Sequence, residues 1–276
     1  MSMEAIEISI TTTTQHKSNM QYQLNLGLHI AIVTNISGGY GGSMFSIESY
    51  TICKKAGIPA ILATFDLRRS YPTIGGDLRR LTIPGVKPRP QDPLYHSEEL
   101  SQVFAEARAN HKFVIIDVPA GFCLNHPMFG VLRNSNILDA TSIAALVPIM
   151  AEDYGTCGAE MAMRTFATSG IRFDRGLFRR WALHGLSSPA NISRLPNYPV
   201  WRTNCLSRRA IDLVTQEAQR VGNPSLNHLP RMIELQADKD LMDIDQRPLE
   251  EAITHLEGAR KAILKTIMAP ISRPVL

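Results

Sequence analysis

The chain has 276 residues, of which 44% are hydrophobic and 20% are charged, as is ordinary for a soluble globular protein able to bury a full core as one α/β domain. The formal net charge of +4 is too small to indicate nucleic-acid binding by itself. No apolar run approaches the roughly 18 residues that a transmembrane helix needs, and we expect no secretory signal at the start of the sequence.

The 4 cysteines lie far apart, without a C-x-x-C pair, and the 8 histidines are scattered. This spacing favours free thiols in a reducing cytoplasm and gives no cluster of zinc ligands. Residues 1–25 are polar and include a run of threonines, so we expect a poorly ordered tail there. Residues 26–276 are expected to form a single domain.

Short apolar strands alternate with helices along the rest of the chain. Strands are expected at 28–34, 59–65, 113–116, 142–148 and 177–183, with a short one at 226–229. Helices are expected at 43–56, 97–110, 153–169, 207–222 and 248–268. The proline-containing stretch 67–96 is expected to be irregular. This alternation predicts a mostly parallel sheet with helices on both faces, a three-layer α/β/α domain that binds ligands beyond the carboxyl ends of its strands.

A glycine-rich loop follows the first expected strand and reads Ser37-Gly38-Gly39-Tyr40-Gly41-Gly42-Ser43-Met44. Its backbone amides, at the start of a helix, suit a phosphate. The loop is either a dinucleotide-binding G-x-G-x-x-G turn or a degenerate phosphate loop. Gly39 and Gly41 fit G-x-G, but Met44 stands where the third glycine belongs. Asp66, at the end of the second strand, could bind a ribose, so the dinucleotide-binding enzyme stays open as an alternative.

The most specific motif is the segment Ile115-Ile116-Asp117-Val118-Pro119-Ala120-Gly121. It closely resembles the Walker B segment I-I-D-x-P-A-G of the ParA/MinD family of P-loop NTPases. The glycine-rich loop resembles the deviant Walker A motif of that family, K-G-G-x-G-K-[ST]-T. Its three glycines and its hydroxyl residue correspond to Gly38, Gly39, Gly41 and Ser43. Weaker landmarks extend the resemblance over residues 28–268.

The resemblance implies a P-loop NTPase fold with ATP and Mg²⁺ as ligands. It assigns nucleotide contacts to Gly38, Gly39, Tyr40, Gly41, Gly42, Ser43, Met44, Asp117 and Pro230. It also assigns magnesium contacts to Ser43 and Asp117, and the positioning of the attacking water to Asp66. Structural alternatives remain for each: the two aspartates could cap turns between strand and helix, and Ser43 could be only the N-cap of its helix.

Both lysines of the family's phosphate loop are missing. Ser37 replaces the lysine that reaches across a dimer, and Gly42 replaces the lysine that contacts the β- and γ-phosphates. Since phosphoryl transfer depends on positioning and charge stabilisation, each lost contact should cost about two to three orders of magnitude in rate. Arg68 and Arg69 are candidate substitute cations, or simply solvated side chains. We therefore expect weak or absent ATP hydrolysis, and whether the protein is an enzyme stays open.

Partners are implied only by the resemblance: a homodimer or a protein partner, and nonspecific DNA. Candidate DNA contacts are Arg179, Arg180, Arg208 and Arg209, which could equally be uninvolved surface. The apolar face of the last helix is expected to pack on the sheet, and no membrane anchor is evident. The implied role is plasmid partition, conjugative transfer or the positioning of another cargo. The alternative is an interaction scaffold that works without nucleotide.

Overall fold

The computed structural model describes residues 27–36, 42–65, 75–81, 98–123, 126–150, 153–182, 195–204 and 247–269. Its strands are β1 (His29–Val33), β2 (Ala60–Thr64), β3 (Leu78–Arg80), β4 (Phe113–Asp117), β5 (Ser142–Met150), β6 (Arg175–Ala182) and β7 (Val200–Asn204). Its α-helices are α1 (Gly42–Lys55), α2 (Glu98–Ala109), α3 (Pro127–Asn134), α4 (Asp153–Thr168) and α7 (Arg247–Met268). Two short 3₁₀ helices, η1 (Gly75–Asp77) and η2 (Ile137–Asp139), complete the described elements.

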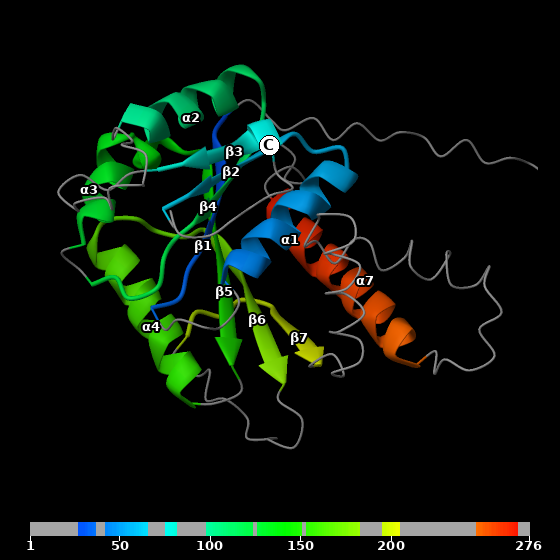
Figure 1. Cartoon of the computed structure of the whole chain (residues 1–276). Helices are drawn as coiled ribbons and strands as arrows, with labels where there is room; N and C mark the ends of the chain where they lie inside the picture. Colours follow the sequence, from blue (N-terminus) through cyan, green and yellow to red (C-terminus); the bar gives the residue numbers. More distant parts are fainter. Residues whose placement is uncertain are drawn as a thin grey trace, which may run out of the picture.

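The seven strands form one sheet in the order β3-β2-β4-β1-β5-β6-β7, and every neighbouring pair is parallel. Alternate side chains of each strand point to opposite faces of the sheet. Ile30 and Ile32 of β1 pack in the core shared with α2, α3 and α4, whereas Ala31 and Val33 pack in the core shared with α1 and α7. Figure 1 shows these two helical layers on either side of the sheet. The predicted three-layer α/β/α class is confirmed.

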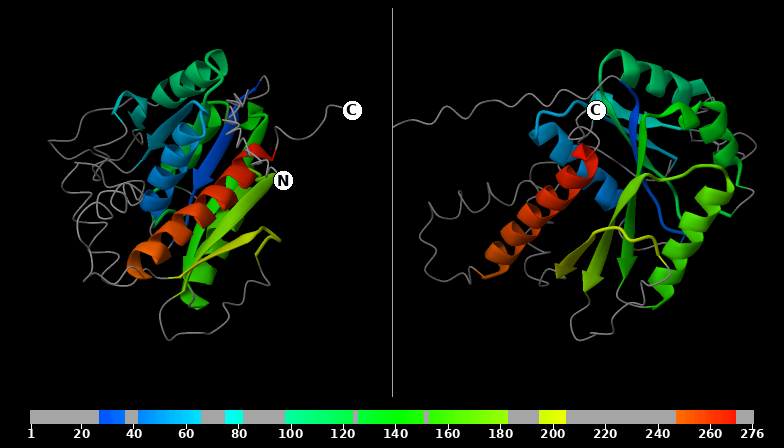
Figure 2. Two further views of the ribbon diagram at one scale, coloured as in Figure 1. Left: turned by 90° about the vertical axis from the view of Figure 1, so that its right-hand side faces the viewer. Right: turned by 180° about the vertical axis from the view of Figure 1, so that it is seen from behind.

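Helix α7 lies alongside α1 and across β6 and β7, as Figure 2 also shows. Ala259, Ile263 and Ile267, spaced at four-residue intervals, are fully buried against this layer. The apolar face of the last helix therefore packs on the sheet, as predicted. Among the described residues, no helix combines the length and the apolar character needed to span a bilayer.

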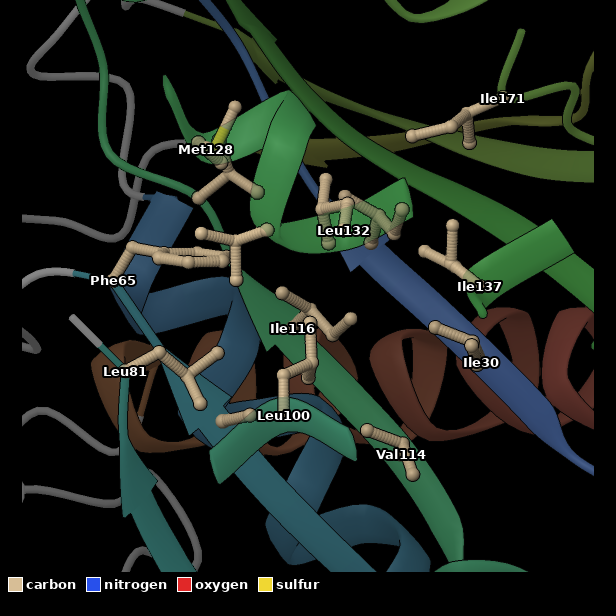
Figure 3. Packing of buried hydrophobic residues seen from close by; sticks show 14 of the residues in the cluster. Ile30, Phe65, Leu81, Leu100, Val114, Ile116, Met128, Leu132, Ile137 and Ile171 are labelled. Carbon is tan, nitrogen blue, oxygen red and sulfur yellow. The ribbon is translucent and has the colours of Figure 1, made fainter. Parts of the chain in front are cut away.

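Strand β3 lies inside the stretch that the sequence suggested was irregular. It pairs in parallel with β2, and the backbone N–H of Leu81 then donates to the carbonyl of Thr64 at 2.8 Å. Leu81 is buried beside Phe65 and Leu100 (Figure 3). The strand escapes prediction because it has only three residues, two of them arginines, and so has no apolar period to detect. Helix α3 and strand β7 were likewise not predicted.

The strand order decides between the two alternatives for the glycine-rich loop. In the usual dinucleotide-binding order, 3-2-1-4-5-6, the second strand lies directly beside the first. Here β4 lies between β1 and β2 and pairs with both. A Rossmann fold is therefore wrong for this chain.

Candidate functional site

The carboxyl ends of the neighbouring strands β2, β4 and β1 lie side by side at one edge of the sheet. Asp117, the last residue of β4, stands in register with Val33 of β1 and with Thr64 of β2, and only 2% of its surface is exposed. The carbonyl of Asp117 accepts a hydrogen bond from the N–H of Phe65, at 3.1 Å. Parallel pairing thus places the Walker B-like aspartate at the central edge where α/β sheets bind ligands.

Two neighbouring segments hold the chain where it leaves β1. The N–H of Thr34 donates to the carbonyl of Leu146 at 3.1 Å, and the side-chain amide of Asn35 donates to the carbonyl of Pro148 at 2.6 Å. These bonds tie the residues that directly follow β1 to β5. Asn35 is a positioning residue that the sequence reasoning missed, although a polar pair directly after a buried strand was a readable signal.

The Walker B-like segment also contacts the chain that leaves β1. The N–H of Gly121 donates to the carbonyl of Ile36 at 2.8 Å. Gly121 adopts a left-handed conformation with φ of 82°, which side chains other than glycine adopt only at a cost. The glycine of this motif is therefore explained by backbone shape, because it turns the segment back toward the chain leaving β1.

The first turn of α1 supplies the helix end beyond the loop. Gly42 begins the helix, and Ser43 follows it with 9% of its surface exposed. The first turn contains no acidic residue that would compete for an anion. A Cβ atom built on Gly42 would meet nothing within 4 Å, so this position has room for a side chain such as lysine. The partial positive charge of a 14-residue helix favours an anion here.

Thr34 carries a buried hydroxyl that has no hydrogen-bond partner among the described residues. The residue lies directly after β1 and is 1% exposed. Buried polar groups are almost always paired, so an orphaned hydroxyl calls for a water or a ligand atom. Together with Asp117 and Ser43, it gives this edge the oxygen ligands that a magnesium ion and a phosphate would use. These residues fit a magnesium-bound nucleotide in kind, with no side-chain cation among them.

Several predicted site residues lie outside the described residues. They are Gly38, Gly39, Tyr40, Gly41, Asp66, Arg68, Arg69, Arg208, Arg209 and Pro230, together with the tail 1–25 and the segments 207–222 and 226–229. Met44 lies in α1 and Arg180 in β6, and only their backbone is described. Within the described residues, no group of three or more potential metal ligands of the histidine, cysteine and carboxylate kinds occurs.

The prediction that Arg179 contacts DNA is wrong, because this side chain is fully buried. Its guanidinium donates two hydrogen bonds to the carboxylate of Glu48 on α1. The guanidinium carbon lies 5.3 Å from the ring centroid of Phe45 and 4.9 Å from that of Trp201. Burial lowers the pKa of Arg179, and the Glu48 carboxylate opposes that shift. Arg179 therefore links α1 to β6 and cannot reach a partner's surface.

Comparison with known proteins finds likenesses of fold. No family model matches the chain, and no curated protein matches it. MinD of Pyrococcus horikoshii, solved with Mg-ADP, is 12% identical, with a TM-score of 0.49 over 90% of this chain and 100% of that one. The cell division protein MinD of Aquifex aeolicus is 13% identical, with a TM-score of 0.48 over 90% and 98%. A ParA-family ATPase of Chlorobium tepidum is 11% identical, with a TM-score of 0.45 over 88% and 97%. At these identities the likeness concerns the fold alone.

Proposed function

We propose that this chain is a ParA-like protein of plasmid partition, conjugative transfer or other cargo positioning. It binds a magnesium-bound adenine nucleotide weakly and hydrolyses it slowly or not at all. The single observation that carries this proposal is the placement of Asp117. A motif found at residues 115–121 puts its carboxylate at the buried carboxyl edge of β4, between β1 and β2.

The loss of cations sets the expected strength of binding. Amide groups and a helix end remain for the phosphates, and Ser43 and Asp117 remain for magnesium, but Gly42 contributes no charge. A hydrogen bond from a charged group contributes about 1.5–3 kcal/mol. Without it, nucleotide affinity should be lower by about one to two orders of magnitude than with a lysine at this position.

Titration calorimetry with ATP, ADP and NAD, each with Mg²⁺, tests the proposal. Weak ATP or ADP binding that disappears without Mg²⁺ and in Asp117→Ala supports it. Binding of none of the three nucleotides would instead identify an interaction scaffold that works without nucleotide. Arg180, Arg208 and Arg209 stay candidate contacts for nonspecific DNA, and homodimerisation or a protein partner stays part of the proposal. A gel shift at low salt with Arg208→Ala and Arg209→Ala tests the DNA contact.

A further inference from the structure

A groove of about 600 Å³ lies at the opposite edge of the sheet from Asp117. It runs between the second half of α7 and the beginnings of β6 and β7. Because every strand is parallel, these beginnings lie at the amino edge, away from the carboxyl edge of the candidate nucleotide site. Residues that line the groove and matter for its chemistry are Leu177, Trp201, Lys261, Ala262 and Lys265.

Arg175 fixes the end of the groove. Its Nε donates to the carbonyl of Thr266 on α7 at 2.7 Å, and its two terminal nitrogens donate to Asp174 at 2.8 Å and to Ser142 at 3.1 Å. These bonds hold α7 against the start of β6. Arg175 and the carboxylate of Asp174 also form an ion pair. The groove is thus preformed, as small-molecule sites usually are.

Trp201 forms a rigid part of the apolar wall. A Cβ atom on Gly258 of α7 would lie only 3.1 Å from the indole nitrogen, so any side chain there would have to displace the ring or the helix by a few tenths of an ångström. On its other side the ring lies 4.9 Å from the guanidinium carbon of the buried Arg179. The indole is therefore held between α7 and β6, on the same face of the sheet as the side chains of Leu177 and Ala262.

Lys261 and Lys265 supply the charge of the groove. Both side chains are exposed and line the groove, and neither forms an ion pair with a residue of the described ranges. They lie one helical turn apart, about 6 Å along the axis. With Asp174 paired to Arg175, the groove keeps two positive charges that no described residue neutralises, next to an apolar wall.

We propose that this groove binds a small amphipathic carboxylate, with an aliphatic or aromatic body. The body lies against Trp201 and Ala262, and the carboxylate lies between the ammonium groups of Lys261 and Lys265. The volume lies within the roughly 300–1,000 Å³ of small-molecule sites, and an apolar lining with a few polar groups is their usual composition. Because the groove and the candidate nucleotide site occupy opposite edges of the sheet, either can fail without the other.

The test uses calorimetric titration of the full chain with decanoate and with decanol, which shares its body but has no charge. We expect decanoate to bind more tightly than decanol. The double variant Lys261→Gln with Lys265→Gln should weaken decanoate binding about tenfold and leave decanol binding unchanged, because two surface charge contacts are lost. Ala262→Trp should fill the groove and abolish binding of both.

Arg260→Gln is the matched control, since Arg260 lies on α7, is exposed and does not line the groove. It should bind decanoate as the wild type does. Thermal unfolding of each variant separates loss of binding from loss of fold. Equal affinity for decanoate and decanol, or the same loss in the control as in the double variant, would overturn the proposal. Binding of an acidic amphipathic peptide in the absence of decanoate binding would overturn it too and would indicate a protein partner.

Discussion

Arg179 was expected at the surface from the sequence, but the structure buries it. In the sequence it is one of two adjacent arginines, a pattern typical of solvated surface. In the fold it is fully buried and pairs with Glu48, which lies 131 positions away. A single sequence carries no sign of a partner at that separation. By contrast, Asp117 and Gly121 could be placed from the sequence, because a local motif fixes both their chemistry and their position after a strand.

We expect Arg179→Met to destabilise the protein by about 3–5 kcal/mol, because it leaves the Glu48 carboxylate buried without its partner. The double variant Arg179→Met with Glu48→Leu should recover most of that loss, since it replaces both charges with apolar side chains. Urea unfolding of the two variants and the wild type measures both effects. A wild-type unfolding midpoint for Arg179→Met would show that this side chain is not in the core.

A pair of glycines tests the backbone of the Walker B-like segment. Gly121→Ala should destabilise the protein by roughly 1–2 kcal/mol, because the Cβ atom of alanine is strained in the left-handed conformation at φ of 82°. Gly130→Ala is the matched control in α3, where a Cβ meets nothing within 4 Å, and it should be stabilising by roughly 0.5–1 kcal/mol. Thermal unfolding distinguishes the two. A shift of the same sign in both would contradict the assigned backbone role.

At the scale of elements, the central strands and the helices that cover them could mostly be predicted, whereas α3 and the two outermost described strands, β3 and β7, could not. β1, β2, β4 and β5 are apolar runs, and α1 and α4 are followed by Gly57 and Gly170, which have φ of 75° and 83°. Strand β3 depends instead on charged contacts from other elements. The ammonium nitrogen of Lys54 lies 3.0 Å from a carboxylate oxygen of Asp77 in η1. A guanidinium nitrogen of Arg79 in β3 lies 3.0 Å from a carboxylate oxygen of Glu106 in α2.

This edge network should make the stability of the protein sensitive to acid. Burial tends to raise the pKa of Asp77, but hydrogen bonds from Tyr50 and Lys54 outweigh it and hold the pKa below its ordinary value. A hydrogen bond from Lys112 is the main reason that the pKa of Glu106 is also lowered. Since both folded-state pKa values are depressed, the stabilisation is fully present above the unfolded values of about 4 and is lost as the pH falls through the folded values.

The double variant Asp77→Asn with Glu106→Gln should therefore lose less of its thermal stability between pH 7 and pH 3 than the wild type. Melting curves at a series of pH values measure that difference. Glu160→Gln removes a carboxylate from an ion pair within α4, away from β3, and should keep the wild-type drop. If the melting temperatures of the double variant and the wild type fall equally, these ion pairs do not stabilise β3 at the edge of the described sheet.

At the scale of the whole molecule, one parallel sheet separates the candidate nucleotide site from the proposed groove site. Its carboxyl edge gathers Asp117, Ser43 and the hydroxyl of Thr34, which has no partner among the described residues, and its amino edge carries the groove beside Trp201. The sequence could predict the first edge because α/β sheets bind ligands there. It could not predict the groove, because that surface joins the beginnings of β6 and β7 to a helix that follows much later in the chain.

The most direct test of the central claim is to restore the lysine. If the carboxyl edge keeps a phosphate site that lacks only its cation, Gly42→Lys should bind magnesium-bound ATP about 10–100 times more tightly than the wild type by calorimetry. Gly130→Lys adds the same side chain to α3 and should change nothing, since both positions have room for a side chain. Equal ATP affinity in Gly42→Lys, Gly130→Lys and the wild type would contradict the claim.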